Sequence, residues 1–348
     1  MNPLIFLLLL FGLILGTTIT ATSSHWLLAW MGLEINTLAI IPLMAQQHHP
    51  RSTEATTKYF LTQATAAATL LFASISNAWL TGQWDISLMT HPLPTTMITI
   101  ALSLKIGLAP LHIWLPEVLQ GLDLLTGLIM STWQKLAPFM LLLQLPNPNQ
   151  ELLIALGLAS TLIGGWGGLN QTQLRKILAY SSIAHLGWML IIIQFAPSLT
   201  LLALLTYLIM TTSAFLAMKY NNTTNINSLS LSWAKAPMLT ALFPLVLLSL
   251  GGLPPMTGFM PKWLILQELT KQQLPIIATM MALTALLSLY FYLRLSYAMT
   301  LTVAPATLAS TASWRLTPSQ PSLPLTLSTL TSIFLLPLLP TMACLSSL

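Results

Sequence analysis

Hydrophobic residues run along most of this chain in long stretches, and short polar or proline-rich segments separate them. Within each stretch the apolar residues are continuous rather than alternating, which favours helices over the strands of a membrane barrel. A helix that spans a lipid bilayer needs about 20 mostly apolar residues. By this measure the pattern predicts an all-α polytopic protein with eleven spanning helices, at about 3–21, 25–45, 56–80, 95–121, 123–144, 150–169, 174–194, 198–219, 236–272, 275–300 and 323–345.

Two of these segments, 95–121 and 236–272, are too long for one ordinary span, and each is interrupted near its middle. The interruptions read "GLAP" at 107–110 and "GGLPPMTG" at 251–258. In lipid, the backbone groups that such breaks free are tolerated only where protein or a water cavity satisfies them. The two breaks therefore indicate a polar interior.

The positions of the breaks suggest an internal repeat. Each falls in the fourth helix of a five-helix series, which predicts two inverted five-helix repeats, about 1–145 and 150–300. A final helix, about 323–345, completes what we expect to be a single membrane domain over 1–348.

Composition agrees with a membrane protein. Only 5% of the 348 residues are charged, 55% are hydrophobic, and the mean hydropathy is +0.79. Soluble domains carry roughly 25% charged residues, so a soluble fold is excluded and the net charge of +5 concerns topology rather than nucleic-acid binding. Cys344 is the only cysteine, which excludes an internal disulfide and a cysteine-ligated iron–sulfur cluster. The start, "MNPLIFLLLLFGLILG", lacks a basic leader and is expected to be a mature helix.

The basic residues of the loops gather on one side of the predicted membrane. With eleven spans, the N-terminal side holds Arg51, Lys58, Arg175, Lys176, Lys219, Lys235 and Arg315. The opposite side holds Lys271 beside Glu268, together with Asp85 and Glu151. The positive-inside rule then places the N-terminus in the cytoplasm or matrix and the C-terminus across the membrane.

Several titratable residues fall inside predicted spans. They are Glu34, Lys105, Lys135, Lys262 and His185. A charge at the bilayer centre costs at least about 2.5–3.5 kcal/mol on insertion scales, so intramembrane charges usually serve a function. The alternative is that a lysine near a span end, above all Lys262, extends its ammonium group to the surface.

A buried lysine beside a movable carboxylate can carry protons, because the carboxylate stabilises the charged form and burial favours the neutral form. Glu34 is the only acid deep inside a span, and Lys105 is its expected partner, within about 4–6 Å or through one water. Lys135 would be the next group along the proton path, and Lys262 the group after it. His185 would bridge, since imidazole titrates near neutral pH.

His112 lies beyond the first break and has two interpretations: a relay or water-organising group, or a hydrogen bond to the broken backbone. Glu117 and Asp123 approach a membrane surface and are expected to cap or solvate helix ends. We expect no metal site.

Three stretches carry a family resemblance: "LAPLHIWLPEVL" at 108–119, "YSSIAHLGW" at 180–188 and "GGLPPMTGFMPKW" at 251–263. Together they resemble the antiporter-like membrane subunits of respiratory complex I, a family that also includes cation/proton antiporter subunits. The resemblance covers most of the chain. It implies two inverted five-helix repeats. It also implies that Glu34 and Lys105 form the first ion pair of a proton relay, that Lys135 is its central group and that Lys262 is its outlet.

The resemblance also implies a setting. The chain would lie in the mitochondrial inner membrane, with a matrix N-terminus, neighbouring antiporter-like subunits and lipid as partners, and no nucleic acid. NADH, flavin, iron–sulfur clusters and ubiquinone would belong to other subunits, and a structural lipid such as cardiolipin is left open. Two alternatives remain: a scaffold subunit without its own proton path, and a free-standing cation/proton antiporter.

Overall fold

The computed structural model describes residues 3–46, 49–146, 148–234, 236–302, 323–338 and 340–341. The regular elements in these ranges are helices, and the only β-type pairings there are the isolated bridges His25–Asp85 and Gln173–Asn225. Lys235, Arg315, Cys344 and the end of the last expected span lie outside the described residues. The all-α prediction is confirmed, while the count of eleven spans and the repeat layout stay predictions.

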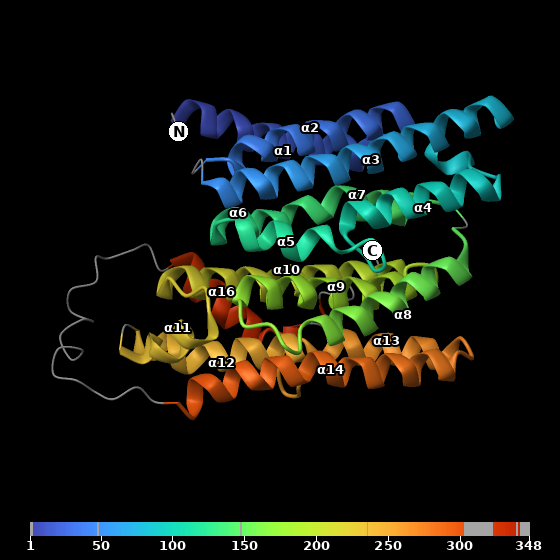
Figure 1. The fold of residues 1–348 in the computed structure, drawn as a ribbon. Coiled ribbons are helices and arrows are strands. Elements are labelled where there is room, and N and C mark those ends of the chain that lie inside the picture. Colours follow the sequence, from blue (N-terminus) through green and yellow to red (C-terminus); the bar gives the residue numbers. More distant parts are fainter. Residues whose placement is uncertain are drawn as a thin grey trace. The chain divides into compact units, whose positions relative to one another are not determined.

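The chain divides into two compact units, Met1–Ala159 and Ser160–Leu348. The expected single membrane domain stays a prediction. The helices of the first unit, coloured from blue to green in Figure 1, are α1 (Pro3–Thr22), α2 (Trp26–Met44), α3 (Pro50–Thr81), α4 (Pro92–Ile106), α5 (Trp114–Gly121), α6 (Leu124–Ser131) and α7 (Trp133–Gln144). Helix α2 packs on α1 and α3, α3 packs on α4 and α5, and α7 contacts α1, α2 and α4.

The second unit begins within α8 (Gln150–Gly167). Its other helices are α9 (Leu174–Ile192), α10 (Pro197–Asn221), α11 (Ile226–Ser230), α12 (Pro237–Gly251), α13 (Phe259–Lys271), α14 (Pro275–Thr300) and α16 (Leu323–Phe334). Helix α10 is packed against α9, α12, α13 and α16, and α14 contacts α9, α12 and α13. Five helices of the described part, α1, α2, α3, α10 and α14, are long and apolar enough to cross a membrane.

Both expected breaks are present, and both begin in the same way. Gly107 caps the C-terminus of α4 and Gly252 caps that of α12, each with a positive φ, 85° and 79°. The amides of Gly107 and Leu108 both donate to Ser103 O, and the amides of Gly252 and Leu253 both donate to Leu248 O. Glycine favours this left-handed ending because it has no Cβ to clash. Each break is therefore a built helix ending rather than a gradual bend.

Apart from the two breaks, two expected spans are not single continuous helices. The expected span 123–144 is split into α6 and α7 at Thr132, whose amide and hydroxyl both donate to Leu128 O, a bonding pattern that bends helices. Within the last expected span, 323–345, α16 ends at Phe334 and a 3-10 turn, Leu336–Leu338, follows. Pro337 explains this end, because it lacks an N–H and disfavours a helical residue before it.

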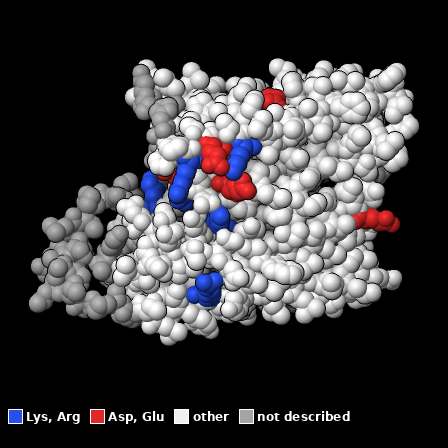
Figure 2. Space-filling view, viewed as in Figure 1, with Lys and Arg blue, Asp and Glu red and all other residues white. Residues whose placement is uncertain are grey.

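Charged side chains are sparse on the face shown in Figure 2, where a few acidic and basic groups lie close together within a large uncharged surface. In the first unit, the Lys58 ammonium group lies 2.7 Å from Glu54 Oε1 and 2.8 Å from Glu117 Oε2. In the second unit, the Arg294 guanidinium donates to Leu169 O over 2.7 Å. An uncharged surface of this kind suits lipid rather than water.

Candidate functional site

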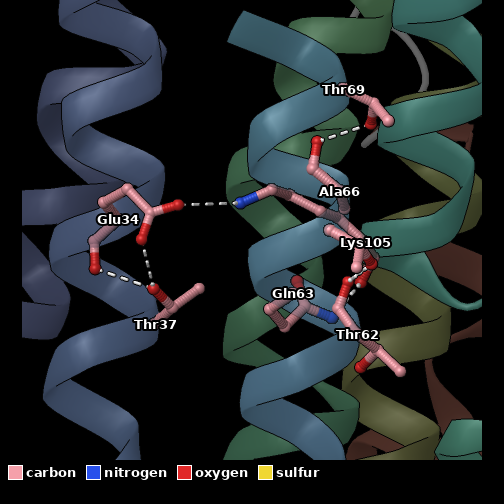
Figure 3. A network of polar contacts seen from close by, with 8 residues as sticks. Glu34, Thr37, Thr62, Gln63, Ala66, Thr69 and Lys105 are labelled. Carbon is pink, nitrogen blue, oxygen red and sulfur yellow. Dashed lines mark hydrogen bonds and ion pairs between the residues drawn. The ribbon is translucent and has the colours of Figure 1, made fainter.

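Glu34 and Lys105 form an ion pair inside the first unit. Glu34 lies in the middle of α2 and Lys105 in the last turn of α4, and their side chains point toward one another (Figure 3). Lys105 Nζ is 3.9 Å from Glu34 Oε1, and the Lys105 side chain is only 2% exposed against 26% for Glu34. The Thr37 hydroxyl donates to Glu34 Oε2 over 3.2 Å and holds the carboxylate from the following turn. The proximity expected from the sequence is therefore observed.

The break beside Lys105 is satisfied by side chains. The indole of Trp114, at the start of α5, donates to Leu104 O over 3.1 Å. The Gln63 amide of α3 donates to Lys105 O over 3.5 Å. Two carbonyls of the last turn of α4 thus bond to protein side chains, as a break inside a membrane requires.

A small cavity lies next to the ion pair, and both expected lysines of this unit line it. About 20 Å³ of it is open to the centre of a water molecule, which is room for at least one water. The lining residues are Leu33, Asn36, Thr37, Tyr59, Gln63, Lys105, Ile106, Trp114, Leu115, Met130, Gln134, Lys135, Ala137 and Pro138. Lys135 lies in the first turn of α7 and is 3% exposed. Residues from six helices, α2 to α7, therefore enclose one space into which several polar side chains face.

Several polar atoms at this site have no hydrogen-bond partner among the described residues. They are Glu34 Oε1, Lys105 Nζ and both side-chain polar atoms of Asn36. The 3.9 Å between Glu34 and Lys105 is too long for a direct hydrogen bond. Buried polar groups are normally hydrogen-bonded, often to ordered water. The site is therefore suited to water-mediated contacts.

Lys262 lies in the second unit and has a different environment. Its ammonium donates to Gly251 O over 2.8 Å and to Leu250 O over 3.5 Å. These are terminal carbonyls of α12, where a helix favours a positive charge. The lysine after the second break thus caps the helix that precedes it.

The two expected histidines lie in different settings. His185, in α9, is 8% exposed, and its ring centre is 5.7 Å from that of Tyr207. His112 Nδ1 lies 3.3 Å from Pro110 O, and His112 is not among the residues that line the cavity. The contact of His112 favours the backbone interpretation over the relay interpretation.

Glu117 and Asp123 lie near helix ends but do not cap them through their side chains. Glu117 is in the first turn of α5 and pairs with Lys58. Asp123 occupies the N-cap position of α6, and its side chain makes no capping hydrogen bond. Among the described residues, no group of three His, Cys, Asp or Glu side chains is placed to hold a metal ion.

Four polar residues of the site were not identified from the sequence: Asn36, Tyr59, Gln63 and Gln134. Three of them are amides within apolar helices, and Gln134 directly precedes Lys135. Burying a side-chain amide in a membrane span costs free energy unless the amide is hydrogen-bonded. The amides in these helices therefore indicate a polar site already in the sequence.

The fold and the site define a class: an all-helical polytopic membrane protein with ionisable groups at broken helices. Residues 23–288 match the family model described as NADH:quinone oxidoreductase/Mrp antiporter, transmembrane, and residues 289–343 match NADH dehydrogenase subunit 2 C-terminus. The chain belongs to the NADH:quinone oxidoreductase/Mrp antiporter family. The resemblance noted in the sequence is thereby confirmed.

Individual relatives narrow the comparison. The chain is 73% identical over 340 residues to NADH-ubiquinone oxidoreductase chain 2 of Tetraodon nigroviridis, covering 98% of each chain. It is 68% identical over 349 residues to the same-named protein of Salmo salar, covering 100% of each.

Solved structures agree with the sequence comparison. A chain of respiratory complex I from Thermus thermophilus with bound aureothin is 30% identical, with a TM-score of 0.81 over 97% of this chain and 80% of that one. A chain of the Mrp complex from Dietzia sp. is 16% identical and shares the fold, with a TM-score of 0.84 over 97% of this chain and 77% of that one.

Proposed function

We propose that this chain is a membrane-arm subunit of respiratory complex I that relays protons across the mitochondrial inner membrane. The observation that supports the relay most directly is the cavity lined by both Lys105 and Lys135, with Glu34 paired to Lys105. The high identity to proteins named NADH-ubiquinone oxidoreductase chain 2 supports the setting. Electron transfer from NADH through flavin and iron–sulfur clusters to ubiquinone is proposed for other subunits.

The proposed step is a proton transfer governed by charge. The Glu34 carboxylate stabilises the Lys105 ammonium while the two lie close together. When the carboxylate moves away, burial favours the neutral amine, and the proton leaves Lys105 through water in the cavity. Lys135 then receives it.

Further relay groups belong to the second unit. Lys262 and His185 are proposed as later acceptors, on the basis of the family resemblance, of the burial of His185 and of the half-buried position of Lys262 at the end of α12. His112 is proposed to organise the break rather than to carry protons, because its ring contacts Pro110 O. The matrix location of the N-terminus, the neighbouring membrane-arm subunits and bound lipid are part of the same proposal.

The test is Lys135→Met in the intact complex. Methionine has nearly the volume of the lysine stem, and such swaps usually cost under about 1.5 kcal/mol in packing. The variant should therefore assemble on native gels, while proton uptake by vesicles and quinone reduction both fall strongly. Lys219→Met, which removes an exposed lysine, is the matched control and should change neither rate.

The outcome separates a relay from a scaffold. Normal assembly of Lys135→Met with an unchanged ratio of protons to electrons would reject the relay and favour the scaffold. Proton exchange for a metal cation by this chain alone in liposomes would favour the free-standing antiporter instead.

A further inference from the structure

Asn36 is a buried amide with nothing to bond to in the described part of the chain. It lies in α2, two residues after Glu34, and is 1% exposed. Neither its Nδ2 nor its Oδ1 has a hydrogen-bond partner. Leaving both polar ends of an amide unsatisfied is costly, so a native protein rarely does so without a bound water or a function.

Its neighbours make room for this amide. A Cβ added to Gly16 of α1 would lie 2.5 Å from Asn36 Oδ1 and 2.8 Å from Gly32 O. Only a glycine at position 16 lets α1 approach the amide this closely. The Asn36 side chain is therefore accommodated by the packing of α1 on α2.

Asn36 also shares a cavity with the two lysines of the site. It lines the cavity that Lys105 and Lys135 line. The Gln134 amide donates to Asn36 O over 3.4 Å, which ties the backbone of α2 to α7 one residue before Lys135. Asn36 thus lies two residues from Glu34 on α2, and its backbone contacts the turn of α7 that carries Lys135.

We infer that Asn36 is a positioning residue that orders the water linking Lys105 to Lys135. A carboxamide offers two N–H donors and an acceptor oxygen, and a buried water needs two to four such partners. Because the amide is neutral, it can hold a water between two cations without pairing permanently with either. The inference rests on the proposed function and adds to it the group that organises the transfer.

The test replaces the amide by an apolar group of similar size, Asn36→Leu, in the intact complex. We expect assembly to persist and proton pumping to fall about five- to tenfold, the loss typical of one buried hydrogen-bonding group. The solvent deuterium isotope effect on turnover should rise, because proton transfer becomes slower than the other steps. Asn36→Ser, which keeps a donor and an acceptor, should recover much of the rate.

Asn77→Leu is the matched control. Asn77 lies in α3, is 0% exposed and is also an amide, but it does not line the cavity. It should leave the isotope effect unchanged. Wild-type pumping by Asn36→Leu, or an equal loss in Asn77→Leu, would overturn the inference.

An experimental structure of the wild-type complex at a resolution that shows waters provides a second test that does not depend on a variant. It should place a water within hydrogen-bond distance of the Asn36 amide. A dry amide would overturn the inference even if Asn36→Leu fails to assemble. The two variants also separate the two hypotheses. If Lys135→Met loses pumping while Asn36→Leu pumps normally, only the role of Asn36 is rejected. If Lys135→Met pumps normally, the proposed relay itself is rejected.

Discussion

The ammonium groups of Lys105 and Lys262 are stabilised in two different ways. Lys105 faces a carboxylate, Glu34, across 3.9 Å. Lys262 instead donates to the terminal carbonyls of α12, with Gly251 O at 2.8 Å. A carboxylate can move or take up a proton, whereas helix carbonyls remain in place. The charge state of Lys105 is therefore easier to change by a movement of its partner than that of Lys262.

The first prediction at this scale separates the charge of Lys262 from its ability to release a proton. Lys262→Arg keeps a cation and its donors but does not lose its proton, so the end of α12 should stay ordered while pumping falls. Lys262→Met removes both, and exchange of the Gly252 and Leu253 amides should speed up about three- to tenfold. Hydrogen exchange and vesicle pumping measure the two effects. Pumping at the normal rate by Lys262→Arg would exclude a proton-releasing role.

The second prediction concerns the ion pair. Glu34→Gln leaves a buried ammonium without its counter-charge, which costs about 3–5 kcal/mol when a pair is broken. Yield of the assembled complex should therefore fall. The double variant Glu34→Gln/Lys105→Met removes both charges, so assembly should recover while pumping stays low. Native gels and proton uptake give the two readouts, and a double variant as poorly assembled as Glu34→Gln would show that the two side chains are not coupled.

At the scale of elements, the short helix after the first break is held by α3. A Cβ added to Gly121 of α5 would lie 2.6 Å from Arg51 O, so the two helices approach closely there. The Tyr59 and Trp114 rings meet at 5.8 Å, and Lys58 joins Glu117 across the same interface. Since Trp114 also bonds Leu104 O and lines the cavity, the placement of α5 shapes the site.

Glu117→Gln should loosen α5, because it removes the one ion pair that joins α5 to α3 in the described residues. Exposed ion pairs stabilise only weakly, so amide exchange in α5 should rise by at most about fivefold. Glu54→Gln is the control, since Glu54 pairs with Lys58 on the same helix and does not contact α5 through that pair. The charge swap Lys58→Glu/Glu117→Lys should restore slow exchange, and its failure to do so would show that the pair does not hold α5.

At the scale of the whole molecule, Arg175, Lys219 and Arg294 of the second unit lie toward one end of their helices. The Gln173–Asn225 bridge and the contact of Arg294 with Leu169 O bring together the helix ends that carry Arg175 and Lys219. Lys271 lies at the other end of its helix pair, beside Glu268. This asymmetry is what the positive-inside rule requires of a protein that crosses a membrane.

The topology can be tested with two native lysines. Lys219 and Lys271 are both exposed. An impermeant amine reagent added to mitoplasts should label Lys271 from the intermembrane side, whereas Lys219 should react only in inside-out vesicles, from the matrix side. Mass spectrometry locates the labels. The reverse pattern would invert the proposed orientation.

The sequence by itself determined the class of protein, the two breaks and the residues that carry charge into the interior. Hydropathy and length are local properties, and Gly107 and Gly252 end their helices through their own backbone freedom. The family resemblance likewise rests on short local stretches, so it too was available without a fold.

Only the tertiary structure decided which of these residues meet. Helices that are apolar all round show little amphipathic pattern, so the sequence does not indicate which face of α2 turns toward α4. The Glu34–Lys105 pair was predicted from the sequence because Glu34 is the only acid deep inside a span, but packing alone placed Asn36 and Lys135 on one cavity and directed Lys262 to the end of α12. The split at Thr132 likewise depends on the hydrogen bond from its hydroxyl to Leu128 O. Several other threonines of this chain could form the same kind of bond, so the sequence does not single out Thr132.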